Sequence, residues 1–296
     1  MDIDAFSQHL RNRDRTPGTI RSYGQEINRF AAWFEQTNGQ LLTPAGLTSR
    51  DVRDYREHMQ TVAHAAPATI NRRLAALRAY GAWLVDSGQL DSNPAQHARL
   101  VAEQQLAPRW LDRRQLAALE RELQRAVQSA RTEASRFRAI RNQAIGALLI
   151  YSGIRVGELS ALEPGDLAIT ERAGWLTIRR GKGNKQRKLP VILEARRPLA
   201  AWLEIRPAGA ALFCDQDGQA LLPRGVQRAI EECGRLAGVP VTPHVLRHTY
   251  AKNLADAGVT ATQIAALLGH SKLETTRIYT QPSERDLQLA VEKLGD

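Results

Sequence analysis

The sequence predicts a mainly α-helical protein with a small β-sheet or hairpin, an α+β fold arranged in two domains. Three observations lead to this prediction. Apolar residues recur three and four apart through the first third of the chain, which is the spacing of one helix face. Two short strand-like runs flank a glycine-containing turn in the middle, and helical spacing returns from Gln227 onward. The length of 296 residues suffices for two hydrophobic cores.

The first domain is expected over residues 1–94 as a four-helix unit. Thr16 and Pro17 open one helix, whose apolar face carries Ile20, Tyr23, Ile27, Phe30 and Phe34. A shorter helix follows, with Val52, Tyr55 and Met59 on one face. Pro67 starts a further helix, which Gly88 closes. Residues 95–108 are predicted to be a linker, with Pro108 as the boundary.

The second domain is expected over residues 109–296 as a mixed α/β unit. Residues 112–126 and 138–151 have helical patterns, and the polar stretch 128–136 between them is either a loop or a helix extension. Residues 175–178 and 188–192 are strand-like and flank a turn at 181–185, which contains two glycines.

The net charge of +10 is concentrated in the middle third of the chain. Residues 101–200 carry 19 basic and 10 acidic groups, a net of +9, whereas the flanking thirds have net charges of +2 and −1. Such a concentration is typical of a surface that binds a polyanion such as nucleic acid. The alternative is an ordinary solvated surface rich in arginine.

Several classes of protein are disfavoured by composition. No apolar run approaches the roughly 18 residues of a membrane span, and the N-terminus lacks a signal-peptide pattern. Cys214 and Cys233 have no metal-binding or redox spacing, which favours a reducing cytoplasm and two buried, unreactive thiols. We therefore expect a cytoplasmic protein with no membrane partner.

The candidate site consists of six residues in a fixed order along the chain. A tyrosine hydroxyl, with an ordinary pKa of about 10, is a weak nucleophile and needs activation. Guanidinium groups match the oxygens of a phosphodiester two at a time and stabilise the extra charge of its pentacovalent state. The residues are Arg155, Lys182, His244, Arg247, His270 and Tyr279. By itself Tyr279 would be interpreted as a half-buried core aromatic.

Two further residues lie within this pattern. Glu158, one turn after Arg155, is expected to hold Arg155 or a histidine in place; the alternative is a surface ion pair of little energetic value. His248 is four residues from His244, which raises the question of a zinc site. Val245 stands where a zinc protease would have glutamate, so no metal is predicted, and His248 is expected to pack against the following helix.

Additional basic residues are candidates for DNA contacts. In the first domain they lie partly off the apolar face of one helix, where ordinary helix solubility explains them equally well. In the second domain they surround the glycine-containing turn. The candidates are Arg72, Arg73, Arg78, Arg179, Arg180, Lys185, Arg187 and Lys188.

Taken together, these motifs resemble the tyrosine recombinase family, the phage-integrase and Xer-like site-specific DNA recombinases. The resemblance covers nearly the whole chain and implies an N-terminal core-binding (SAM-like) domain followed by a catalytic domain. It implies that Tyr279 forms a 3′-phosphotyrosyl bond while Arg155, Arg247 and a histidine stabilise the phosphorane. Lys182 would protonate the leaving oxygen, His244 would assist proton transfer at Tyr279, and His270 would bind the phosphate.

The resemblance also implies what the enzyme needs. No cofactor or metal is expected, because the covalent link stores the bond energy. The expected partner is a double-stranded DNA recombination site, bound by a homodimer on each site and a tetramer in the synapse, with strands exchanged through a Holliday junction. The C-terminal helix over 284–294 resembles a tail that docks into a neighbouring subunit. A second recombinase or an accessory protein remains open, as do integration, excision and the resolution of dimers or cointegrates.

The sequence departs from the family pattern at two places, and three other functions were considered. Gln281 stands where many relatives carry a basic residue, and the segment 128–138 looks longer than in compact Xer-like members. A type IB topoisomerase would use the same chemistry as a monomer, and an inactive DNA-binding regulator would use the same fold. A metal-dependent nuclease is disfavoured, because the paired carboxylates that hold magnesium are missing.

Overall fold

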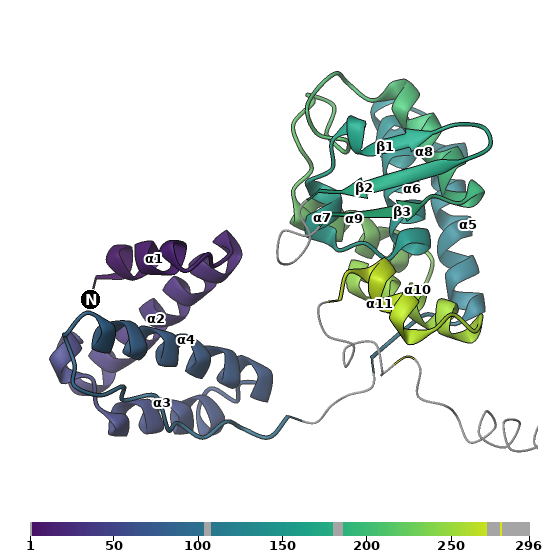
Figure 1. Cartoon of the computed structure of the whole chain (residues 1–296). Coiled ribbons are helices and arrows are strands. Elements are labelled where there is room, and N and C mark those ends of the chain that lie inside the picture. Colours follow the sequence, from purple (N-terminus) through teal and green to yellow (C-terminus); the bar gives the residue numbers. More distant parts are fainter. Residues whose placement is uncertain (1, 104–107, 180–185, 271–278, 280–296) are drawn as a thin grey trace, which may run out of the picture. The chain divides into compact units, whose positions relative to one another are not determined.

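The computed structural model describes residues 2–103, 108–179, 186–270 and 279 (Figure 1). The chain divides into two compact units, Met1–Leu106 and Ala107–Asp296. The fold class predicted from the sequence is confirmed: the structure is mostly helical with one small sheet. No helix in the described ranges has both the length and the apolarity to cross a membrane.

Within residues 2–103 the first unit contains α1 (Ile3–Asn12), α2 (Pro17–Asn38), α3 (Ser49–Thr61) and α4 (Pro67–Asp86). The predicted start of α2 is confirmed, since the Thr16 hydroxyl accepts from the Thr19 N–H and Pro17 takes the first helical position. The apolar face predicted for this helix enters a core with the aromatic residues Phe6, Phe30 and Tyr80, each at most 1% exposed.

The segment after α4 is attached to the first unit, which differs from the expected linker over 95–108. Ala95 is 1% exposed, and the Asn71 side chain exchanges two hydrogen bonds of 2.9 Å with the backbone of Val101. The Arg78 guanidinium donates to the carbonyls of Ala95 and Ala98. These contacts join residues up to 30 positions apart, so hydropathy along the segment gave no sign of them.

In the second unit α6 (Glu133–Ser152) runs through the core. The other helices described there are α5 (Arg113–Ser129), α7 (Val156–Ser160), α8 (Leu193–Ile205), α9 (Pro223–Leu236), α10 (Pro243–Asp256) and α11 (Ala261–Leu268). The polar stretch 128–136 is mostly helical: α5 continues to Ser129, and Thr132 caps α6. The helix α8, which contains Pro198, was not predicted from the sequence.

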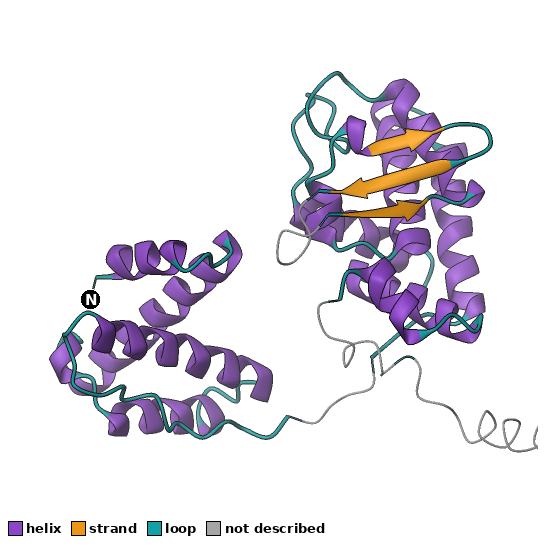
Figure 2. Ribbon diagram, viewed as in Figure 1, coloured by secondary structure: helices purple, strands orange, loops and turns teal. Residues whose placement is uncertain are grey.

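The strands of the second unit form one antiparallel sheet in the order β1-β2-β3 (Figure 2). The predicted strands correspond to β2 (Gly174–Ile178) and β3 (Arg187–Pro190), whereas β1 (Leu167–Ile169) has only three residues and was not predicted. Leu167, Leu176 and Leu189 lie in register and are at most 8% exposed. This face packs into the same core as α6 and α8, which fixes β3 relative to the candidate site.

Candidate functional site

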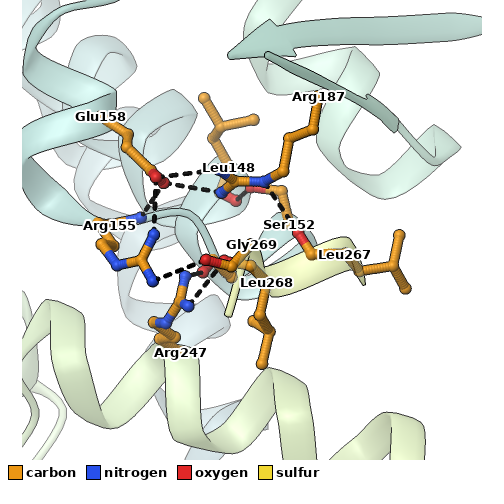
Figure 3. Close-up of polar contacts among 10 residues, drawn as sticks. Leu148, Ser152, Arg155, Glu158, Arg187, Arg247, Leu267, Leu268 and Gly269 are labelled. Carbon is orange, nitrogen blue, oxygen red and sulfur yellow. Dashed lines mark hydrogen bonds and ion pairs between the residues drawn. The ribbon is translucent and has the colours of Figure 1, made fainter. Parts of the chain in front are cut away.

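Arg155 stands directly after the turn that ends α6 and immediately before α7 (Figure 3). Its backbone N–H and its Nη1 donate to the Glu158 carboxylate, each at 2.9 Å. Its Nη2 donates to the carbonyl of Gly269 at 3.1 Å. The side chain remains 32% exposed. Arg155 is therefore held from two sides and still has N–H groups available to an anion.

Glu158 accepts from two arginines at once (Figure 3). Its Oε1 accepts from Nη1 of Arg155 at 2.9 Å and from Nη1 of Arg187 at 3.0 Å, and its Oε2 accepts from Nη2 of Arg187 at 2.8 Å. Burial alone would raise the pKa of this carboxyl, but hydrogen bonds from Arg187 and Arg155 outweigh burial and lower it. Glu158 thus stays ionised and hydrogen-bonds to both guanidinium groups.

Arg247, on α10, is held by backbone carbonyls in a buried position (Figure 3). Its Nη1 donates to the Gly153 carbonyl at 2.6 Å and its Nη2 to the Leu268 carbonyl at 2.8 Å. Burial, and then the nearby Arg155 charge, lowers the pKa of Arg247 to about 10, so it keeps its positive charge at neutral pH. Arg247 and Arg155 therefore bind neighbouring carbonyls, Leu268 and Gly269, at the end of α11.

Two histidines of the site, His244 and His270, are affected by the charges of these arginines. Burial and the charges of Arg247 and Arg155 lower the pKa of His244. Burial, with the same two arginines, lowers the pKa of His270 to about 4. Both imidazoles are therefore neutral at pH 7 and can accept hydrogen bonds.

Tyr279 is 6% exposed and packs with Ala251, Ile264 and Leu268 of α10 and α11. Its hydroxyl faces Nδ1 of His248, and the centroids of the two rings are 5.5 Å apart. Burial raises the pKa of Tyr279, although the Arg247 charge acts in the opposite direction. The phenol is therefore protonated at neutral pH and requires a proton acceptor before it can act as a nucleophile.

His248 is the site residue that sequence analysis missed. It was expected to pack against the following helix, but its ring meets Tyr279 and lies 4.2 Å from the His244 ring, centroid to centroid. The sequence contained a sign of this position, because His244 and His248 are four residues apart and therefore lie on one face of the helix. Within the described part of the chain no group of three or more histidine, cysteine and carboxylate side chains could hold a metal ion.

The remaining candidates are placed differently. Lys182, Arg180 and Lys185 lie outside the described residues, as do Gln281 and the C-terminal segment 284–294. Lys188 is exposed on β3, whereas Arg179 pairs with Glu163 and Asp166. In the first unit, Arg72 and Arg73 both pair with the buried Glu26. The guanidinium of Arg187 lies in the Glu158 network instead of on the surface, and its side chain is 12% exposed.

Comparison with known proteins gives a consistent result for both units. Residues 117–285 match the Phage integrase family, and residues 3–89 match the phage-integrase N-terminal SAM-like domain. The tyrosine recombinase XerC of Azotobacter vinelandii is 33% identical over 285 residues, which cover 94% of this chain and 90% of that protein. XerC of Pseudomonas aeruginosa strain PAO1 is 33% identical over 287 residues, with 94% and 89% covered.

Solved structures agree on the fold. The XerH site-specific recombinase, bound to a palindromic difH substrate in a post-cleavage complex, has a TM-score of 0.74 at 20% identity, covering 98% of this chain and 85% of that one. The Tn1549 transposon integrase, in complex with transposon right-end DNA, has a TM-score of 0.73 at 18% identity, with 99% of each chain covered.

Proposed function

The chain belongs to the phage integrase family and is a tyrosine recombinase, and from this premise we propose that Tyr279 cuts and rejoins a double-stranded DNA site. The observation that carries the proposal is the position of Arg155 and Arg247 on adjacent carbonyls, beside a tyrosine–histidine pair. Two fixed guanidinium groups provide a binding site for one phosphate, and Tyr279 provides the nucleophile.

In the proposed reaction the Tyr279 Oη attacks the scissile phosphorus. A bond from the tyrosine oxygen to phosphorus forms and the bond from phosphorus to O5′ breaks, which gives a 3′-phosphotyrosyl link and a free 5′-hydroxyl. The phenol proton passes to a histidine of the His244–His248 pair, and Lys182 donates a proton to O5′. One phosphodiester replaces another, so neither ATP nor a metal ion is needed.

The other residues act on the phosphate. Arg155 and Arg247 neutralise the charge that grows on its non-bridging oxygens, and His270 hydrogen-bonds to one of them. His248 is the proposed acceptor because its Nδ1 lies against the phenol; burial and nearby positive charges lower its pKa to about 4, so its ring is unprotonated at pH 7. In this structure His248 faces the Tyr279 hydroxyl directly.

We propose DNA in the cytoplasm as the partner, with one protomer on each half of a recombination site. XerH is described bound to its difH substrate, and lambda integrase as a dimer bound to a core site. A dimer on each of two sites gives a tetramer that exchanges strands through a Holliday junction. Arg72, Arg73, Arg78, Arg179, Arg180, Lys185 and Lys188 are retained as candidate contacts to the DNA backbone.

The test is covalent trapping on nicked suicide duplexes drawn from the DNA that flanks the gene, in buffer containing EDTA. Wild type is expected to form an SDS-resistant adduct, whereas Tyr279→Phe is expected to bind the duplex equally well and form none. Phenylalanine preserves the packing against Ile264 and Leu268, so folding is not the variable. An adduct with Tyr279→Phe would assign the nucleophile elsewhere. Tight binding without any wild-type adduct would favour a DNA-binding regulator.

A further inference from the structure

Arg187 uses all three of its nitrogens inside the protein. Nη1 and Nη2 donate to the two oxygens of Glu158 at 3.0 and 2.8 Å, and Nε donates to the Leu267 carbonyl at 3.1 Å. A paired guanidinium in this fork geometry is strongly oriented. Its neighbour on β3, Lys188, has an exposed side chain. Adjacent basic residues of one strand therefore have opposite surroundings, as the alternation of side chains along a strand requires.

The Arg187 guanidinium is connected to Arg155 through Glu158. The carboxylate lies between the two arginines, and its Oε1 accepts from both (Figure 3). Glu158 itself is 9% exposed, so each of its hydrogen bonds is shielded from water. Without Arg187, the carboxylate loses two donors and gains rotational freedom. The Arg155 guanidinium then keeps its bond to the Gly269 carbonyl, but its bond to Glu158 rests on a carboxylate that only the Arg155 backbone N–H still orients.

The same guanidinium also supports the end of α11. Its Nε holds the Leu267 carbonyl, while the next two carbonyls, Leu268 and Gly269, accept from Arg247 and Arg155. Gly269 has a φ of +65°, and a Cβ there would lie 2.7 Å from Nη1 of Arg187. The backbone therefore passes directly against the guanidinium, and the carbonyls that hold both arginines are fixed relative to it.

We propose that Arg187 is a positioning residue for the recombinase reaction, which sets both Arg155 and Arg247, and is not the DNA-phosphate contact that the sequence suggested. The inference rests on the proposed function, because it concerns the groups that bind the scissile phosphate. Arg187 acts through the Glu158 carboxylate on one side and through the carbonyls of 267–269 on the other.

The test separates DNA binding from cleavage in Arg187→Gln. Single-turnover cleavage of a nicked suicide duplex at saturating protein is expected to fall roughly 100-fold, the loss typical of a catalytic group displaced by about 1 Å. The slope of log affinity against log salt is expected to stay at the wild-type value, because no phosphate contact is lost. Arg235→Gln, an exposed arginine of α9, is the matched control and should leave both quantities unchanged.

Two readouts are specific to positioning. A methylphosphonate at the scissile position is uncharged, so cleavage of that duplex depends less on two oriented guanidinium groups. The ratio of the wild-type cleavage rate to the Arg187→Gln rate should therefore fall below about tenfold. Glu158→Gln is expected to slow cleavage too, and the losses in the double variant should be clearly less than additive, because part of the Arg187 effect passes through Glu158.

Opposite results would overturn the inference. If Arg187→Gln lowers the salt slope by about one unit and cleaves at the wild-type rate when saturated, Arg187 is a phosphate contact. Additive losses of cleavage rate in the double variant would exclude action through Glu158 and Arg155. An unchanged ratio of wild-type to Arg187→Gln cleavage rates on the methylphosphonate duplex would exclude it too. Should Arg187→Gln fail to fold, Arg187→Lys keeps the buried charge without the fork geometry and is subject to the same comparisons. Absence of any wild-type adduct would instead refute the proposed function.

Discussion

Gly153 offers a quantitative test of how tightly the site is packed. It ends α6 with φ +59°, in the left-handed region that favours glycine, and its carbonyl accepts from Arg247. A Cβ at this position would lie 2.4 Å from the Tyr250 ring and 2.9 Å from a Leu268 methyl group. Gly153→Ala therefore combines a strained backbone with a steric overlap. Gly258, after α10, has φ +80° and open space around a built Cβ, so Gly258→Ala has only the first of these effects.

The expected free energies follow from this difference. A non-glycine residue in the left-handed region costs about 1–2 kcal/mol, which is the full expectation for Gly258→Ala. Inserting a methyl group into a packed interior costs a further 1–3 kcal/mol or so, because Tyr250 and Leu268 must shift. Gly153→Ala should therefore destabilise the second unit by about 2–5 kcal/mol, and the shift of its carbonyl should also reorient Arg247.

The assay is hydrogen exchange by mass spectrometry on the full-length variants, with peptides from α6 and α10 reporting the free energy of opening. We expect protection in these peptides to fall further in Gly153→Ala than in Gly258→Ala, by at least about 1 kcal/mol. Equal losses in the two variants would refute the reasoning, since they would show that Tyr250 and Leu268 yield to an added methyl group without cost.

Two further predictions concern proton transfer and pH. Lys182→Ala should cleave ordinary DNA far more slowly and recover on a duplex with a 5′-bridging phosphorothiolate, whose sulfur leaves without a proton; failure to recover in single-turnover assays would remove Lys182 from the acid role. His248 and His270 have pKa values lowered from 6.5 to about 4 by burial and nearby positive charge. Between pH 4 and pH 6.5 the unfolded chain therefore binds more protons than the folded chain. The free energy of unfolding should accordingly fall as the pH drops from about 6.5 to about 4. His248→Gln should flatten this fall in urea-unfolding midpoints, and an unchanged pH dependence would contradict the shift.

Much of the fold was predictable because its signals are local. The apolar spacing of α2, α3 and α4 and the capping residue Thr16 predicted helices whose burial the structure confirms. The strand-like runs at β2 and β3 were equally clear. The elements that were not predicted have weak or conflicting local signals: the three residues of β1 are too few for a pattern, and α8 contains a proline, which is unfavourable inside a helix.

The sequence by itself determined the chemistry of this protein: a tyrosine among arginines, histidines and a lysine, in the order typical of one family, supplies the groups for phosphoryl transfer. Which of these groups contact one another was decided only by the tertiary structure. Arg187 meets Glu158 across 29 residues, and Arg155 meets Gly269 across 114. The pairing of His248 with Tyr279 likewise spans 31 residues. Residue type fixes what a side chain can donate or accept, but its partner depends on how distant segments pack, and no local pattern records that.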